Sequence, residues 1–211
     1  MLYLIRSREA RRLQASATEA AGLDPLTMVL TRRGVLGVLE AEVARCLRSD
    51  VSLGVLMVDF DHLSRINEEH GRDAGNAILT EGARRVRNNV RIYDSVGRCG
   101  GEEFLVVLPS CDEMELNNIA GRIRMMIERG AFPWKGYPLR VTVSIGGLTT
   151  FALDEKSADR LVRSAERLLA EAKSLGRNRV QISEPFELTE ESSLGLALET
   201  ERRPTDEGDE P

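Results

Sequence analysis

Two hydrophobic patterns alternate along this chain. In one, apolar residues recur at helical spacing, and in the other they form short runs typical of strands. The continuous apolar run SLGVLMV at residues 52–58 predicts a strand buried on both faces. Apolar residues recur at helical spacing on both sides of it, which predicts a series of amphipathic helices. The expected helices are 32–47, 63–69, 73–89, 112–129 and 158–175, and the other expected strands are 95–99, 102–108, 139–148 and 179–182.

The order of these elements predicts the fold class. From residue 52 onward a strand, helices, a hairpin, a helix, a strand, a helix and a closing strand follow one another. This order matches an α/β (α+β) fold with a βαββαβ core, in which helices pack on a central, mostly antiparallel sheet. The Gly100-Gly101 pair between two strand-like runs predicts the hairpin of this core.

The two ends of the chain differ from this core. Residues 1–22 are expected to form an N-terminal helix, either a plain surface helix or a dimerising element. Asp24-Pro25 marks a break, so the domain is expected at residues 23–183. Residues 184–211 are polar and acidic, and we expect them to be disordered.

Composition narrows the class of protein. The chain has 211 residues, of which 42% are hydrophobic, enough for one domain with its own core. A net charge of -5 argues against nucleic acid as a partner but leaves nucleotides open. No stretch approaches the ~20 apolar residues of a membrane span, and the charged start does not resemble a signal peptide. Three cysteines without CxxC spacing predict reduced thiols in a cytoplasmic protein.

Carboxylates at two strand ends are the candidates for chemistry. Asp59 and Asp61 follow the buried run, and Glu102 and Glu103 follow the Gly-Gly pair. Because a central strand and an adjacent hairpin are neighbours in such a sheet, these side chains are expected to converge as ligands for Mg²⁺ or Mn²⁺. The glycines would let a triphosphate approach the hairpin backbone and allow a tight turn. Alone, GGEE is more typical of an ordinary turn with solvent-facing glutamates, and the preceding DFD at the end of the buried run favours the metal site.

Four motifs in order resemble the GGDEF family of diguanylate cyclases over residues 24–182. They are GGEEF at 100–104, MVDFDHLSRIN at 57–67, VTVSIGG at 141–147 and AKSLGRNRV at 172–180. The resemblance implies a palm-like fold shared with nucleotidyl cyclases and polymerases, and a homodimer that holds one GTP in each subunit. It implies that the 3′-oxygen of one GTP attacks the α-phosphorus of the other, so that cyclic di-GMP forms and pyrophosphate leaves.

The same resemblance implies roles at the metal site. Asp59 and Glu102 match side-chain metal ligands, and the backbone carbonyl of Phe60 matches a further ligand. Glu103 would lie beside the metal. The family residue that matches Glu102 is also proposed to deprotonate the attacking 3′-hydroxyl, so Glu102 and Glu103 are the expected catalytic residues.

The resemblance also implies a substrate-binding set. Lys173 and Arg177 match cations that hold the phosphates, and their spacing of four would place both on one helical face. Asn67 matches the residue that hydrogen-bonds the guanine edge. Asn76 stands where the family usually has a guanine-reading Asp. Gly100 and Gly101 complete this set.

An RxxD motif forms a separate expected site. Arg91 and Asp94 stand at the family's offset from Gly100 for the inhibitory site that binds the product cyclic di-GMP. Arg can grip a phosphate with a bidentate fork and stack on guanine, and Asp can accept from the guanine edge. Arg122 is expected to provide a second arginine contact to the product at this inhibitory site.

Three departures from the family pattern leave alternatives open. Asn76 offers an amide with one acceptor and one donor where a carboxylate accepts only, which puts strict selection of GTP in doubt. Ser64 replaces a usual phosphate-stabilising lysine, and the adjacent Arg65 is a candidate substitute. DPLTMVLTRR at 24–33 departs from DxLTGLxNRR in residues that we expect to be structural. The alternatives are a cyclase that makes cyclic GMP-AMP and a weakly active cyclic di-GMP receptor.

Overall fold

The computed structural model describes residues 22–49, 51–151, 154 and 157–183. The predicted N-terminal helix at residues 1–22, apart from residue 22, and the whole predicted acidic tail at residues 184–211 lie outside the described residues. None of the helices within the described part of the chain is both long and apolar enough to cross a membrane.

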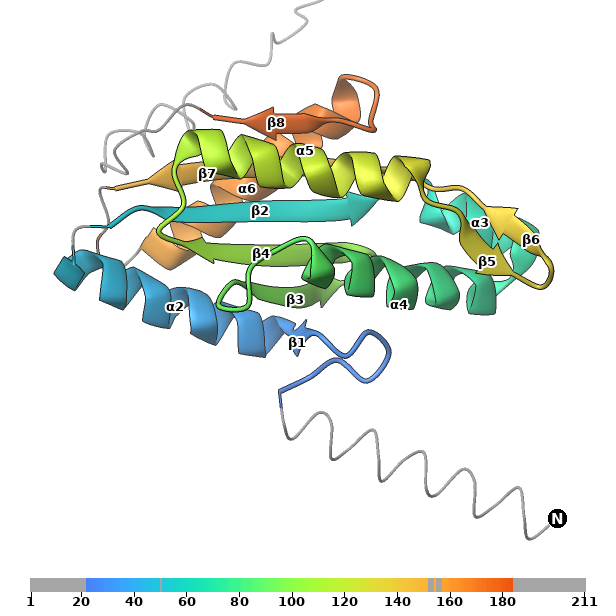
Figure 1. The fold of residues 1–211 in the computed structure, drawn as a ribbon, viewed down its shortest axis with the longest axis horizontal. Helices are drawn as coiled ribbons and strands as arrows, with labels where there is room; N and C mark the ends of the chain where they lie inside the picture. Colours follow the sequence, from blue (N-terminus) through green and yellow to red (C-terminus); the bar gives the residue numbers. More distant parts are fainter. Residues whose placement is uncertain (1–21, 50, 152–153, 155–156, 184–211) are drawn as a thin grey trace, which may run out of the picture.

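A six-stranded sheet forms the centre of the molecule (Figure 1). Its order is β1-β3-β4-β2-β7-β8, with β2 in the middle. Three strand pairs, β3–β4, β4–β2 and β2–β7, are antiparallel, and the two edge pairs, β1–β3 and β7–β8, are parallel. The bounds are β1 Leu30–Thr31, β2 Leu53–Phe60, β3 Ser95–Gly100, β4 Glu103–Pro109, β7 Val143–Thr150 and β8 Val180–Ile182. The predicted mostly antiparallel sheet is therefore confirmed.

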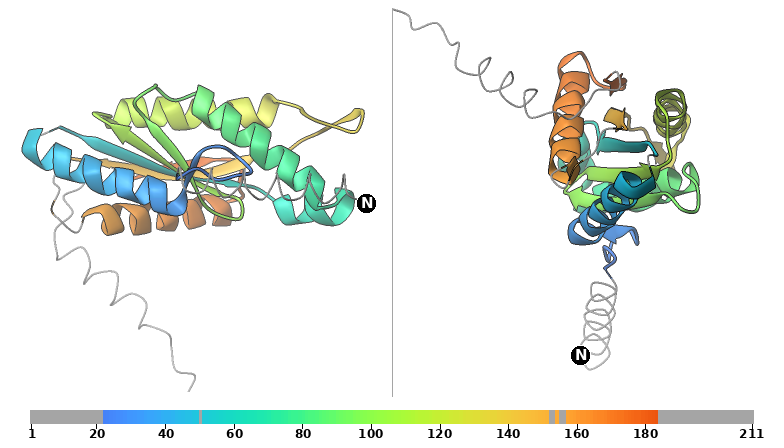
Figure 2. Two further views of the ribbon diagram at one scale, coloured as in Figure 1. Left: turned by 90° about the horizontal axis from the view of Figure 1, so that it is seen from below. Right: turned by 90° about the vertical axis from the view of Figure 1, so that its left-hand side faces the viewer.

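Helices cover both faces of this sheet, as the end-on view in Figure 2 shows. On one face α4 and α5 pack against a core that includes Leu56, Val58 and Phe60 of β2. On the other face α2 and α6 pack against a second core that includes Val55 and Met57. The helix bounds are α2 Arg32–Ser49, α3 Leu63–His70, α4 Arg72–Asn88, α5 Glu113–Arg129 and α6 Ser157–Ser174.

The apolar run at residues 52–58 is explained by these two cores. Successive side chains of a strand point to opposite faces. Every residue of β2 is buried, so the strand needs apolar side chains at nearly every position. Asp59 is the one charged residue within β2 and directly precedes Phe60, where the strand ends. Packing in the two apolar cores does not explain why a buried carboxylate stands at this position.

A small hairpin was not predicted from the sequence. It consists of β5 Phe132–Trp134 and β6 Tyr137–Leu139, joined by Lys135 and Gly136 with φ of 43° and 91°. The prediction of one strand at 139–148 is wrong, because Leu139 ends β6 and β7 begins only at Val143. Each of the two short strands contains a proline, a residue that is uncommon inside strands. The Arg85 guanidinium, 4.1 Å from the centre of the Phe132 ring, holds the hairpin against α4.

Candidate active site

The carboxylates singled out at two strand ends converge where the central strands β2 and β4 meet the β3–β4 turn. Asp59 of β2 is paired in register with Glu103 of β4. The backbone N–H of Phe60 donates to the carbonyl of Glu102 at 3.3 Å, which ties the end of β2 to the hairpin turn. Asp59, Glu102 and Glu103 are therefore neighbours because β2 and β4 are adjacent antiparallel strands.

The β3–β4 hairpin that carries the glutamates turns one residue later than expected. β3 ends at Gly100 and β4 begins at Glu103, so the turn consists of Gly101 and Glu102 rather than Gly100 and Gly101. Neither glycine has a positive φ, so the turn does not require glycine for its conformation. A Cβ added at Gly101 would meet nothing within 4 Å. The hairpin backbone is therefore open to an approaching ligand.

Arg98 supports this turn and was missed in the sequence. Its Nη2 donates to the carbonyl of Gly101 at 2.6 Å, and its Nη1 lies 3.3 Å from Oδ1 of Asp24. Asp24 in turn accepts from the hydroxyl of Thr27 at 2.6 Å. The DPLT segment therefore stabilises the GGEEF hairpin through the contact between Asp24 and Arg98. Only the pairing across 74 residues reveals this role, so no local pattern could have found it.

Lys173 of α6 is the cation nearest to the buried carboxylate. Its Nζ lies 2.9 Å from Oδ2 of Asp59. Burial nevertheless raises the pKa of Asp59 to about 6, with Lys173 lowering it and the charges of Glu102 and Glu103 raising it. Burial also raises the pKa of Glu102, against the lowering effect of Lys173. The cluster therefore carries more negative charge than one lysine neutralises.

Asp61 lies close enough to this cluster for its charge to help raise the pKa of Glu102, but its oxygens accept hydrogen bonds from other elements. Its Oδ1 accepts from the hydroxyl of Ser144 at 2.7 Å. Its Oδ2 accepts from the hydroxyl of Thr142 at 2.6 Å and from the backbone N–H of Asn178 at 3.1 Å. Both oxygens are thus engaged by the protein, because Asp61 lies beyond the end of β2 and faces β7.

Within residues 22–49, 51–151, 154 and 157–183, no three His, Cys, Asp or Glu side chains are placed to hold a metal ion. Magnesium in nucleotide sites takes one or two carboxylates and completes its shell with phosphates and water. Asp59 and Glu102 with the carbonyl of Phe60 remain the candidate donors.

The two predicted phosphate-binding cations do not share a helical face. α6 ends at Ser174, and Gly176 has a φ of 115°. The N–H of Gly176 donates to the carbonyl of Lys173, and the N–H of Arg177 donates to that of Ala172, a pattern typical of a glycine C-cap. Arg177 therefore projects from the loop after α6, and its direction is set by that loop.

The two asparagines expected to face a base lie where α3 meets α4. The side chain of Asn67 packs on Gly75, where an added Cβ would lie 2.1 Å from its Oδ1. This Oδ1 is buried and has no hydrogen-bond partner within the described residues. Asn76 follows Gly75 on α4 and is exposed. An unpaired acceptor beside an exposed amide suits a ligand that donates hydrogen bonds.

Arg65 is directed along α3 rather than taking the place of the usual lysine. Its Nε lies 2.7 Å from Oε1 of Glu69, one helical turn away. Ser64 beside it is exposed. In this arrangement the guanidinium is held by Glu69, so the structure gives no support to Arg65 as a substitute cation.

The RxxD motif forms a closed turn between α4 and β3. Oδ2 of Asp94 accepts from the N–H of Arg91 at 2.6 Å, while Oδ1 is buried without a hydrogen-bond partner within the described residues. Arg87 donates to the carbonyls of Arg91, Ile92 and Asp94, which fixes the turn. Burial raises the pKa of Asp94.

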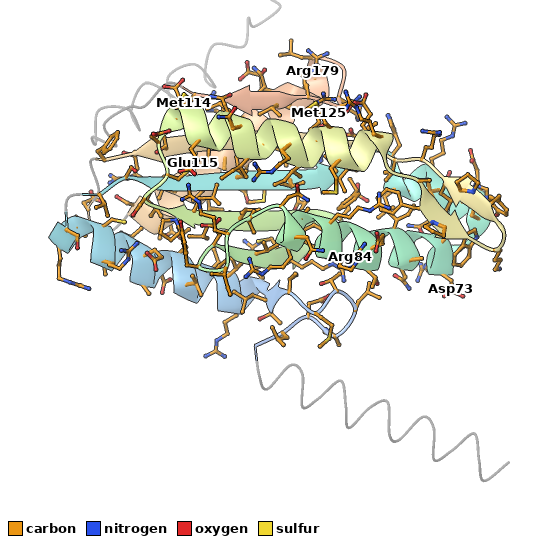
Figure 3. All side chains as sticks on the ribbon, viewed as in Figure 1. Asp73, Arg84, Met114, Glu115, Met125 and Arg179 are labelled. Atoms are coloured by element: carbon orange, nitrogen blue, oxygen red, sulfur yellow. The ribbon has the colours of Figure 1, made fainter. Side chains whose placement is uncertain are left out.

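Arg91 has a partner that the sequence did not indicate. Its guanidinium forms an ion pair with Glu115, which lies near the start of α5 (Figure 3). Arg122, also on α5, donates to the carbonyl of Asn89 at 2.6 Å. The three residues predicted for the product site are thus gathered around the turn that precedes β3. The six residues of β3 separate this turn from the GGEEF hairpin by about 20 Å.

The chain matches known proteins over most of its length. A family model described as "Diguanylate cyclase, GGDEF domain" matches residues 21–179. The chain is 36% identical over 132 residues to diguanylate cyclase A of Treponema denticola, covering 63% of this chain and 35% of that protein. It is 36% identical over 160 residues to diguanylate cyclase DgcP of Pseudomonas aeruginosa, covering 76% and 24%. The chain thus spans well under half the length of these curated relatives.

Solved structures of similar proteins share the fold. The diguanylate cyclase SiaD of Pseudomonas aeruginosa, in complex with its activator SiaC, has a TM-score of 0.74 and 30% identity, covering 86% of this chain and 69% of that chain. The active GGEEF domain of a diguanylate cyclase from Vibrio cholerae has a TM-score of 0.66 and 28% identity, covering 72% and 96%. The similarity therefore extends beyond the motifs to the sheet and helices that carry them.

Proposed function

Because this chain belongs to the GGDEF family of diguanylate cyclases, we propose that it condenses two molecules of GTP into cyclic di-GMP with release of pyrophosphate. The observation that carries this proposal is the convergence of Asp59, Glu102 and Glu103 where β2 meets the β3–β4 hairpin, with Lys173 against Asp59. Carboxylates beside a phosphate-binding cation and an open glycine backbone suit phosphoryl transfer.

A divalent metal, Mg²⁺ or Mn²⁺, fits this cluster. Burial and mutual repulsion raise the pKa of both Asp59 and Glu102, so a second positive charge beside them would be stabilised. The side chains of Asp59 and Glu102 and the carbonyl of Phe60 would hold the metal. When bound, it would supply Lewis-acid stabilisation of charge on the transferring phosphate.

The side chains around this cluster would bind the phosphates and accept the proton of the attacking hydroxyl. Lys173 and Arg177 would hold the phosphates, and the backbone at Gly100-Gly101 would let them approach. Glu102, with Glu103 beside it, would accept the proton of the 3′-hydroxyl. The freed oxygen would bond to the α-phosphorus of the second GTP, the bond from that phosphorus to the oxygen of the β-phosphate would break, and pyrophosphate would leave. The 3′-oxygen of the second GTP would then attack the α-phosphorus of the first in the same way, which closes the ring and releases a second pyrophosphate.

Base recognition would rest on α3 and α4. The buried, unpaired Oδ1 of Asn67 supports a role as an acceptor for guanine, whose edge presents an N–H and an amino group. The exposed amide of Asn76 would lie beside it.

The assembly would be a homodimer in the cytoplasm. Each subunit would present one set of phosphate and base contacts, whereas the reaction joins two nucleotides, so two copies would face each other. A cytoplasmic location suits a GTP-consuming protein whose three cysteines, Cys46, Cys99 and Cys111, are free thiols.

The turn that holds Arg91 and Asp94 would bind the product and inhibit. Arg91 and Arg122 would contact the phosphates and bases of cyclic di-GMP, and the buried, unpaired Oδ1 of Asp94 would accept from guanine. Inhibition would follow if product at this turn kept the two active sites apart.

Product analysis tests the activity. The protein is incubated with GTP, with ATP and with both in the presence of Mg²⁺, and the products are identified by mass. Cyclic di-GMP from GTP alone supports the proposal. Cyclic GMP-AMP from the mixture would indicate relaxed base choice. Binding of cyclic di-GMP without any cyclisation would identify a receptor instead.

A further inference from the structure

Asp61 anchors the loop that presents Arg177. The carboxylate is 3% exposed and lies just beyond the end of β2, two residues after Asp59. It receives three hydrogen bonds, two from hydroxyls at the start of β7 and one from the backbone N–H of Asn178. A charged acceptor with three donors in a buried site is a strong and directional anchor. It joins the strand of the metal site to a loop 117 residues away.

The side chain of Asn178 extends this anchor to α5. Its Nδ2 donates to Oε1 of Glu128 at 2.6 Å, and its Oδ1 accepts from Nη1 of Arg124 at 3.0 Å. Arg124 and Glu128 also pair with each other at 3.0 Å. The loop is thus held from both sides, by Asp61 through its backbone and by α5 through the side chain of Asn178.

The backbone of this loop requires such support. Gly176, Arg177 and Asn178 have φ of 115°, 62° and 47°, so two consecutive residues that carry side chains are in the left-handed region. That conformation is unfavourable for an L-residue and persists only where surrounding contacts fix it. The hydrogen bond from the N–H of Asn178 to Asp61 is such a contact, and it fixes the residue next to Arg177.

We propose that Asp61 is a positioning residue for triphosphate recognition, which acts by holding Arg177 in register with Asp59. This inference rests on the proposed function, because it assumes that Arg177 binds the phosphates of GTP. Both oxygens of Asp61 already accept hydrogen bonds from the protein. It acts through the loop, so that the cation from the α6–β8 loop and the carboxylate at the end of β2 face the same phosphates.

The test measures binding of a GTP analogue that carries a methylene group in place of the oxygen between the α- and β-phosphates, with Mg²⁺, by calorimetry. Asp61→Ala removes the anchor and is expected to weaken binding about tenfold or more. Asp61→Asn is expected to stay within about threefold of the parent. Its amide oxygen can accept from Thr142 and Asn178, while its NH₂ donates to the Ser144 hydroxyl, which can rotate.

A double-mutant cycle separates positioning from general stability. In an Arg177→Ala background, Asp61→Ala is expected to cost less than about twofold, because the group through which it acts is gone. If Asp61→Ala does not fold, Thr142→Val removes one of the three donors at nearly constant volume and enters the same cycle, with an expected loss of about threefold in the parent background alone.

Two results would overturn the inference. One is parent-like affinity in Asp61→Ala, or in Thr142→Val where that variant replaces it. The other is an equal loss with and without Arg177. A parent protein that fails to bind the analogue at all would overturn the proposed function as well, which distinguishes the two failures.

Discussion

The ammonium nitrogen of Lys173 lies 2.9 Å from Oδ2 of Asp59, so the carboxylate proposed to bind a metal already has a cation beside it. Lys173 is also the proposed phosphate ligand. The two roles are compatible if Lys173 turns to the triphosphate as the metal reaches Asp59. Metal and nucleotide would then each favour binding of the other, because each removes a charge that opposes it.

Removal of this lysine should strengthen metal binding in the absence of nucleotide. We expect Lys173→Met to bind Mn²⁺ about tenfold more tightly than the parent, since the competing positive charge is lost. The measurement is Mn²⁺ titration followed by electron paramagnetic resonance at pH 8, where Asp59 is ionised more fully than at neutral pH. Lys135→Met, on the turn between β5 and β6, is the matched control. Equal Mn²⁺ affinity in parent and Lys173→Met would show that the ion pair does not compete with the metal.

Loss of either proposed metal ligand should abolish cyclisation. Asp59→Ala and Glu102→Ala are each expected to reduce cyclic di-GMP formation more than about 100-fold while the fold is retained, because Asp59 lies next to the end of β2 and Glu102 lies in the β3–β4 turn. Product formation is measured with Mg²⁺ and GTP, and folding by circular dichroism. Glu68→Ala, exposed on α3, should behave as the parent. Near-parental turnover in either site variant would refute the assigned metal site.

The buried charge of Asp59 should lower the stability of the metal-free protein at neutral pH. Its pKa is raised from 3.8 to about 6, so the folded state binds a proton more readily than the unfolded state between these values. Stability is therefore fully present below about pH 4 and falls as pH rises through about 6. We expect Asp59→Asn to be more stable than the parent at pH 7.5, by on the order of 2 kcal/mol.

Thermal unfolding of both proteins from pH 4 to pH 8, with a metal chelator present, measures this difference. The gap in Tm between Asp59→Asn and the parent should open as pH rises and close toward pH 4. A gap that stays constant over this range would mean that ionisation of Asp59 does not limit stability.

Product binding should depend on the guanidinium of Arg91. Arg91→Ala is expected to weaken binding of cyclic di-GMP by about 2 kcal/mol or more, a loss typical of a charge-assisted contact. Calorimetry with purified cyclic di-GMP gives the affinity directly. Undiminished affinity would argue against this turn as the product site.

Glu115 provides the complementary control for that experiment. Because its carboxylate pairs with Arg91 in the free protein, Glu115→Gln should release the guanidinium and tighten product binding. Weaker binding in Glu115→Gln would instead mean that Glu115 holds Arg91 in its binding position.

Base choice should respond to the amide at position 76. Asn76→Asp is expected to raise the preference for GTP over ATP about tenfold, since both guanine donors regain an acceptor and one such hydrogen bond is worth about 1.4 kcal/mol. The ratio of kcat/KM for the two nucleotides measures this preference. Asn118→Asp, exposed on α5, controls for the added charge. An unchanged ratio would leave base choice to Asn67 and the shape of the pocket.

Local patterns of apolar and turn-forming residues predict much of the fold. The apolar run of β2 indicated a strand between two cores because both faces of that strand are covered, and burial is the property that hydrophobic spacing reports. The Gly-Gly pair marked the hairpin, although the turn lies one residue later, at Gly101 and Glu102. The family motifs suggested the proposed roles of Asp59 and Glu102, which periodicity could not.

The partner of each polar side chain was decided only by the tertiary structure. Asp59 and Asp61 are two residues apart and chemically identical, yet one faces Lys173 and the other receives hydrogen bonds from Thr142, Ser144 and Asn178. Arg91 likewise meets Glu115 on another element. A hydrogen bond needs a donor within about 3 Å and a suitable angle, and a residue far along the chain supplies it. Sequence spacing fixes which face of an element a side chain occupies, and only the packing of distant elements fixes what that side chain meets.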